Sequence, residues 1–265
     1  MQEAAPLTNK ERRDNVAYLF DAFDVAPPRA TDVLEPDDVA AFASGEGAEQ
    51  QRLFFRVLCY GVLAAQPAPE SVIFSDWQRL LAAGVIEDIY QRTFDLAAYA
   101  LDPPVSRGDS KGKVIEFTRL SETRDVWSRL LPEPPDPDVA VDVLHAASGG
   151  ALKSRAFWVV REMRRLGLWQ RPALDPFGYV PDGRVRKRAS RMGLIDLPEK
   201  ADTFADMKAV SRALHAVMRL ARKEQVAYDL PLSMAAQRCE LCDVERMAVC
   251  SLPHCRMRRE RLYEG

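Results

Sequence analysis

The 265-residue sequence predicts an all-α fold, and three observations support that prediction. Apolar residues recur three and four positions apart along most of the chain, which is the spacing of one helix face. Alternating apolar and polar residues beside hairpin turns, the pattern typical of strands, are nearly absent. Prolines and glycines interrupt the apolar segments at intervals that suit helices.

Helices are expected at residues 9–23, 35–45, 49–66, from 75 onward, 85–101, 113–131, 138–147, 152–168, 201–223 and 229–238, and a further one is expected to begin at Asp182. The segment 49–66 carries apolar side chains around most of its circumference, so it should be the central, buried helix. Cys59 within that segment should be a core thiol. Ser75 is the expected cap of the next helix, whereas the front of segment 113–131 is also compatible with a strand.

The net charge of −2 hides an uneven distribution along the chain. Residues 1–150 hold 14 Lys and Arg against 25 Asp and Glu, and residues 151–265 hold 23 against 14. This asymmetry suggests a polyanion partner for the second half, although two halves that attract each other would show it too. No apolar run is long enough to cross a membrane, and the start of the chain lacks a secretory signal. A cytoplasmic protein is therefore expected.

Four of the five cysteines fall close together near the end of the chain: Cys239, Cys242, Cys250 and Cys255. In a cytosolic chain this spacing indicates metal binding rather than disulfides. Four thiolates suit either tetrahedral zinc or a four-cysteine iron–sulfur cluster, and the spacing alone does not choose between them. His254 is expected to lie beside the metal or at the surface, because four cysteines already suffice.

A glycine turn at Gly149-Gly150 joins two of the expected helices. Such a hairpin presents backbone N–H groups at the start of its second helix, where they and the helix dipole suit a phosphate. Lys153 and Arg155 add positive charge next to this turn. Taken alone, the same glycines would equally suit a turn that only packs the two helices together.

Asp182 stands before a run of basic residues. Arg184, Lys187, Arg188 and Arg191 share one helix face by their three- and four-residue spacing, and that face is the candidate contact with a polyanion. Two simpler interpretations remain open. Asp182 could be a plain helix cap, and the basic face could be solvated and paired with acidic residues.

A glycine hairpin, then an aspartate before a basic helix, then four cysteines is the order found in one known family. The chain resembles the helix-hairpin-helix DNA glycosylases of the endonuclease III type, which carry a C-terminal iron–sulfur cluster. The segment from Pro181 to Arg186 is similar to the family's catalytic Val-Asp-Thr-His-Val-x-Arg, although Arg184 replaces its histidine. Val62-Leu-Ala-Ala-Gln66 is similar to its Leu-Leu-Ser-Ala-Gln. The cysteine spacing differs from the one common in the family.

The resemblance implies a role for each of these features. Asp182 would stabilise the sugar cation or position water, and Gln66 would fill the gap left by the extruded base. The hairpin would clamp a phosphate through Gly149, Gly150, Lys153, Ser154 and Arg155. The family hairpin Leu-Pro-Gly-Val-Gly-x-Lys-Thr-Ala fits in two registers. One places Lys153 at the lysine that attacks the sugar, and the other places Ser154 there and Ala156 at the small helix residue.

The sequence thus predicts a two-lobed, all-α DNA N-glycosylase that acts on double-stranded DNA as a monomer, with a [4Fe-4S] cluster or, alternatively, zinc. The expected segments are an acidic extension at 1–46, a helical lobe at 47–137, a hairpin lobe at 138–238 and a cysteine tail at 239–265. One alternative is a non-catalytic, metal-stapled DNA-binding module. A third is a zinc-stapled helical protein whose basic face meets a protein partner.

Overall fold

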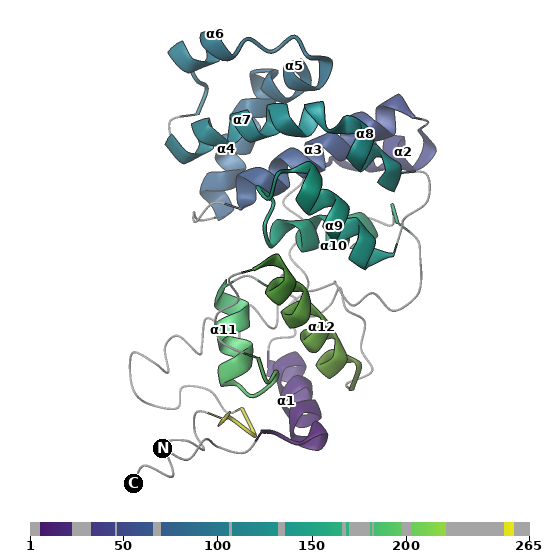
Figure 1. Ribbon diagram of the computed structural model, residues 1–265, viewed down its shortest axis with the longest axis vertical. Helices are drawn as coiled ribbons and strands as arrows, with labels where there is room; N and C mark the ends of the chain where they lie inside the picture. The colour runs from purple at the N-terminus through teal and green to yellow at the C-terminus, as the bar shows by residue number, and fades with distance from the viewer. Residues whose placement is uncertain are drawn as a thin grey trace. The chain divides into compact units, whose positions relative to one another are not determined.

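The computed structural model describes residues 6–22, 33–45, 47–65, 70–105, 108–131, 136–165, 168–169, 181, 183–197, 203–220 and 252–256. Within these ranges the secondary structure is helical and contains no strand, which confirms the prediction of an all-α chain (Figure 1). The chain divides into two compact units. We call residues 29–173 the central unit, and residues 1–28 together with 174–265 the terminal unit.

The central unit contains the helices α2 to α10. Their bounds are α2 Pro36–Ser44, α3 Ala48–Ala64, α4 Glu70–Ala82, α5 Val85–Gln91, α6 Leu96–Leu101, α7 Gly108–Glu122, α8 Arg124–Trp127, a 3-10 turn Ser128–Leu130, α9 Pro137–Ala147 and α10 Arg155–Arg165. Helix α9 begins one residue before the expected position, because Pro137 occupies the first turn and the Asp136 side chain accepts from the Asp138 N–H at 2.9 Å.

Helix α3 is the centre of this unit, as its apolar circumference predicted. Every residue of it from Val57 to Ala64 is buried, including Cys59, and burial raises the pKa of that thiol. Around it α2, α4, α5, α7 and α10 are packed. Aromatic rings pack against one another in this core. The ring centroids of Phe54 and Trp127 lie 5.8 Å apart, and those of Phe55 and Tyr90 lie 5.6 Å apart. Such pairs add to the hydrophobic stabilisation of the core.

Three details of the central unit differ from the sequence-based expectations. Helix α4 begins at Glu70, so Ser75 lies inside it and does not cap it. The expected helix at 85–101 is broken into two, because Arg92 takes a left-handed φ of 60° and Asp95 caps α6 by accepting from two backbone N–H groups. The expected helix at 113–131 is interrupted after Glu122, where α7 ends and α8 and the 3-10 turn follow, although its front, residues 114–118, is helical as expected.

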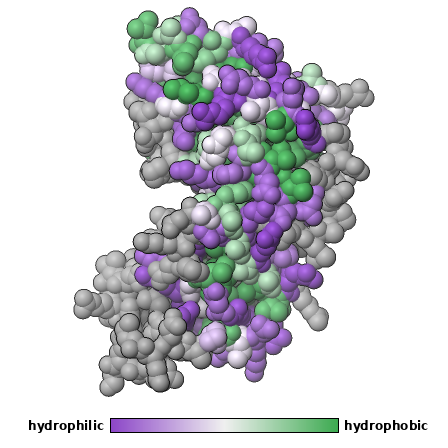
Figure 2. All heavy atoms as spheres, in the orientation of Figure 1, coloured by the Kyte–Doolittle hydropathy of each residue, from purple (hydrophilic) through white to green (hydrophobic). Residues whose placement is uncertain are grey.

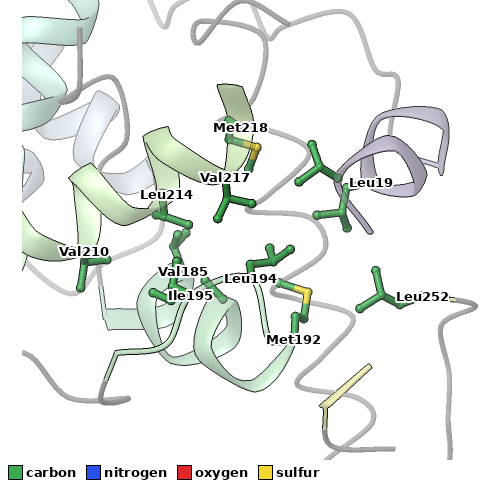
Figure 3. Close-up of a cluster of buried hydrophobic side chains, with 12 residues drawn as sticks. Leu19, Val185, Met192, Leu194, Ile195, Val210, Leu214, Val217, Met218 and Leu252 are labelled. Atoms are coloured by element: carbon green, nitrogen blue, oxygen red, sulfur yellow. The ribbon is translucent and has the colours of Figure 1, made fainter. Parts of the chain in front are cut away.

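The terminal unit contains α1 Asn9–Ala22, α11 Gly183–Arg191, α12 Phe204–Leu220 and the short segment 252–256. These pieces share one hydrophobic core, drawn in Figure 3. Its buried members are Val16, Leu19, Val185, Ala189, Met192, Leu194, Ile195, Val210, Leu214, Val217, Met218 and Leu252. Residues from both ends of the sequence therefore build a single core.

The division into units does not follow the segments expected from the sequence. Helix α1 was expected in an acidic extension with α2, but it packs on α12 in the terminal unit. Helices α9 and α10 belong to the central unit, whereas α11 belongs to the terminal one. Only the contacts of the folded chain reveal this grouping, because the apolar face of a helix does not say which partner will cover it.

Two further surface properties follow from the described residues. None of their helices is both long and apolar enough to span a membrane. Figure 2 shows apolar residues gathered at the end of the central unit that carries α6, where Leu96 and Leu101 are 47% and 88% exposed.

Candidate functional site

The helical hairpin of the central unit joins α9 to α10 through a turn at residues 148–154 (Figure 1). Gly149 and Gly150 have left-handed φ values of 57° and 82°, which glycine adopts most easily. The Gly150 N–H donates to the His145 carbonyl oxygen at 2.9 Å, and this bond closes the end of α9 as glycine caps usually do. Both glycines are therefore required by the backbone of this tight turn.

The backbone amides of the turn are mostly engaged within it. The N–H groups of residues 151–153 donate to Ser148 or Gly150 at 3.1–3.2 Å. Among the described residues, none accepts a hydrogen bond from the Ser154 N–H. One amide is thus available where the sequence suggested several, so an anion at this turn would depend on cationic side chains.

Three cationic side chains lie at the hairpin. Lys153 is exposed and has a left-handed φ of 47°, an uncommon conformation for a residue with a side chain. Arg155 is partly buried, and its Nε donates to the Ala64 carbonyl oxygen at 3.1 Å. That carbonyl lies in the last turn of α3, where backbone acceptors lack helical partners, so Arg155 ties the hairpin to α3.

The third cation, Arg119 of α7, was missed by the sequence reasoning. A side chain at Gly149 would meet its guanidinium 3.0 Å away. Arg119 is half exposed and forms an ion pair with Glu116 at 3.0 Å. The Thr123 hydroxyl, one helical turn later, donates to the Ala147 carbonyl oxygen at 2.9 Å and so holds α7 against α9. No local motif could have linked Arg119 to a turn thirty residues away.

The packing of α10 bears on the two registers of the hairpin. Leu152 and Ala156 are both fully buried, whereas Arg155 is only partly so. The burial of Ala156 agrees with the register that places this residue at the small helix position. The contact with α3 is close, because a side chain at Gly61 would lie 2.9 Å from the Leu152 Cδ2 atom. A glycine at this crossing lets the two elements approach one another.

His145 lies under the turn, and its ring would be 3.5 Å from a side chain placed at Gly150. Burial lowers the pKa of His145, while the nearby Asp142 carboxylate opposes that change. The neutral imidazole is therefore the form that the folded hairpin favours. Gln66, the expected wedge beyond the end of α3, lies outside the described residues.

Helix α11 begins at Gly183, directly after Asp182. Asp182 and the side chain of Arg184 lie outside the described residues. Along α11 a buried face is formed by Val185, Arg188, Ala189 and Met192. Arg188 is 6% exposed, so it departs from the predicted solvent-facing basic surface. Lys187 and Arg191 are partly exposed and remain on that surface.

Of the four candidate metal ligands, Cys255 is described, while Cys239, Cys242 and Cys250 lie outside the described residues. Cys255 is a free thiol that is partly exposed and packs against the core of the terminal unit. A free thiol at the edge of a core fits a ligand for zinc or for an iron–sulfur cluster. The described residues contain no cluster of three or more potential ligands. The ring nitrogens of His254 lie 3.8 Å and 3.5 Å from the carboxylates of Glu11 and Asp14.

The charge asymmetry along the sequence is largely lost when residues are grouped by unit. The terminal unit holds 20 Lys and Arg against 18 Asp and Glu, and the central unit holds 17 against 21. Positive charge is instead local: residues 151–173 hold six Lys and Arg and one acidic residue. A polyanion would therefore meet positive charge at local clusters such as this one, and not across a whole unit.

Comparison with known proteins finds no relative. No protein-family model matches the chain, and neither a curated protein nor a solved structure is found to be similar to it. Its function has to be inferred from its own residues.

Proposed function

We propose that the chain is a DNA N-glycosylase of the helix-hairpin-helix kind, which extrudes a damaged or modified base and cleaves its N-glycosidic bond. The proposal is supported most by the order in which three features follow one another along the chain. A hairpin with two left-handed glycines is followed by a basic helix that begins directly after Asp182. Cys255 then packs on the same core as that basic helix.

Asp182 is the proposed catalytic residue. When the bond between the sugar C1′ and the base nitrogen breaks, positive charge develops on the sugar, and a nearby carboxylate stabilises that charge. The carboxylate also orients or deprotonates the water whose oxygen then bonds to C1′. The base leaves with the bonding electrons and takes up a proton. Extrusion of the base costs a few kcal/mol, which contacts to the DNA backbone must offset.

The proposed DNA contacts come from the hairpin and from α11. At the hairpin, Lys153 supplies an exposed side-chain ammonium and directly precedes Ser154. Arg119 adds a second cation from α7. On α11 the proposed contacts are Arg184, Lys187 and Arg191. Gln66 is proposed to enter the gap left by the extruded base. Arg155 donates to the Ala64 carbonyl oxygen and Arg188 is buried, so we propose that these two residues stabilise the contact surfaces and do not bind DNA themselves.

The four cysteines are proposed to hold a [4Fe-4S] cluster, with zinc as the alternative. Such a group supplies a cross-link for the end of the chain. Its identity is tested by the visible absorption of the purified protein, since an iron–sulfur cluster absorbs near 400 nm, whereas zinc does not absorb visible light. Elemental analysis of the same sample distinguishes iron from zinc directly.

The proposed activity is tested with a panel of DNA duplexes that each carry one damaged or modified base. The expected result is release of free base from at least one duplex, leaving an abasic site. Binding to the panel without any product would favour the non-catalytic DNA-binding module instead. Absence of both binding and product would refute the proposal and favour a protein partner for the basic surface.

A further inference from the structure

Asn15 is a fully buried polar residue in the middle of α1. Its Nδ2 donates to the His254 carbonyl oxygen at 2.8 Å, and its Oδ1 accepts from the His254 N–H at 2.9 Å. The same Nδ2 also approaches the Met192 carbonyl oxygen at 3.4 Å. One amide side chain therefore satisfies both backbone polar groups of His254, the residue that precedes Cys255.

An asparagine is not what a helix interior favours at a core position. It is a weaker helix former than alanine or leucine, and its buried amide is unfavourable unless it is hydrogen-bonded. The nearby apolar residues of α1, Val16 and Leu19, pack in the core of the terminal unit, and Leu19 is labelled there in Figure 3. The amide of Asn15 thus specifies where one particular backbone segment lies against α1.

Other contacts fix the same segment from its two sides. Leu252 is 1% exposed and lies in the core near Leu19 and Met192 (Figure 3). Gly193 has a left-handed φ of 73°, and a side chain there would lie 2.7 Å from the Leu7 Cδ1 atom and 3.4 Å from the Arg256 Cβ atom. The start of α1, the turn after α11 and the segment 252–256 therefore meet at one place.

We propose that Asn15, from α1, is a positioning residue for Cys255, one of the four proposed metal ligands. The amide holds the backbone of His254, and the following residue presents its thiol at the edge of the core. The inference rests on the proposed metal centre, and it assigns a role to a residue that lies 224 positions before Cys239. Partners that orient a metal ligand usually matter almost as much as the ligand itself.

The side chain of His254 takes no part in the two hydrogen bonds with Asn15. Asn15 contacts only the backbone of His254, while the imidazole lies near Glu11 and Asp14. Replacement of the ring by a methyl group in His254→Ala leaves both backbone hydrogen bonds in place. This substitution is therefore a matched control for the loss of the amide in Asn15→Ala.

The test measures how fast the full-length protein releases its bound iron or zinc to an excess of chelator. Asn15→Ala is expected to release the metal roughly 10–100-fold faster than the wild type. His254→Ala should release it at the wild-type rate, and Cys255→Ser should fail to retain it. If Asn15→Ala does not fold, Asn15→Asp keeps the shape and the acceptor for the His254 N–H, and its release rate should fall between those of the wild type and Cys255→Ser.

A second control separates positioning from simple stability. Val210→Ala truncates the same core on α12, at the end far from Leu252 in Figure 3. It should lower the thermal stability without the loss of metal. Equal release from Val210→Ala and Asn15→Ala would overturn the inference, as would wild-type release from Asn15→Ala. A wild-type protein that holds no metal would refute the metal centre and this inference, but would leave the catalytic role of Asp182 to its own assay.

Discussion

Gly61 lies where the hairpin approaches α3 closely, and its replacement by alanine tests that packing. The new methyl group would lie 2.9 Å from the Leu152 Cδ2 atom and 3.2 Å from the Val159 Cγ2 atom. Carbon atoms prefer a separation of about 3.5–4.0 Å, so the neighbours must move by roughly 0.5–1 Å. Overpacking of this kind typically costs 1–3 kcal/mol.

Helix propensity offsets part of this cost, because alanine is favoured over glycine by about 1 kcal/mol within a helix. Gly61→Ala should therefore lower the free energy of unfolding by about 0–2 kcal/mol. Gly112 of α7 provides the matched control, since a side chain there would meet nothing within 4 Å. Gly112→Ala should gain the full helix term of about 1 kcal/mol, or about 3 °C in the midpoint of thermal unfolding.

The two variants should thus differ by about 1–3 kcal/mol when unfolding is followed by circular dichroism. A double-mutant cycle with Leu152→Ala locates the cause, because removal of the Leu152 side chain should relieve most of the cost of Gly61→Ala. If Gly61→Ala stabilised the protein as much as Gly112→Ala does, the close approach of the hairpin to α3 would be wrong.

Three further outcomes test other parts of the site. Burial lowers the pKa of His145, so the unfolded chain binds the proton more readily than the folded chain does. The free energy of unfolding should therefore fall as the pH drops below about 6.5, and this fall should be smaller in His145→Asn. The buried Ala156 favours the register that places Ser154, and not Lys153, at the position of the attacking lysine. Lys153→Ala should therefore retain base release, and borohydride should trap no covalent adduct between the wild-type protein and DNA. A trapped adduct would reverse that assignment. Arg191→Ala should weaken DNA binding and lower the dependence of log Kd on log salt by about one. Arg188→Ala should instead lower the midpoint of thermal unfolding, because its buried side chain packs in the terminal unit; an effect on DNA affinity alone would contradict its burial.

Much of the helical architecture was readable from local sequence. The apolar circumference of α3 predicted a central helix, and residues 48–64 form one, with Cys59 buried inside it. The expected helix at 138–147 matches α9 to within one residue, because the proline before it and the glycines after it act through the local backbone. The predicted start of the next helix was wrong: Ser75 is a residue type that often caps a helix, but α4 already begins at Glu70.

The parts that escaped prediction depend on contacts between distant segments. Arg188 has the helical spacing of a basic face, yet it lies beside Val185 and Met192 because α11 turns that side toward the core. Arg119 reaches Gly149, and Asn15 binds His254, from helices far away in sequence. A charged or polar residue in a single sequence does not show which buried partner its own helix will meet.

The role of Asp182 is tested most directly by single-turnover release of base from a duplex that the wild type processes. Asp182→Asn keeps the shape of the side chain and removes its charge. Base release should fall by roughly 10²–10⁴-fold while the affinity for the same duplex is unchanged. Asp196→Asn is the control, because this exposed carboxylate pairs with Arg12 in the same unit and should leave the rate unaltered. Wild-type rates from Asp182→Asn would contradict the proposed mechanism.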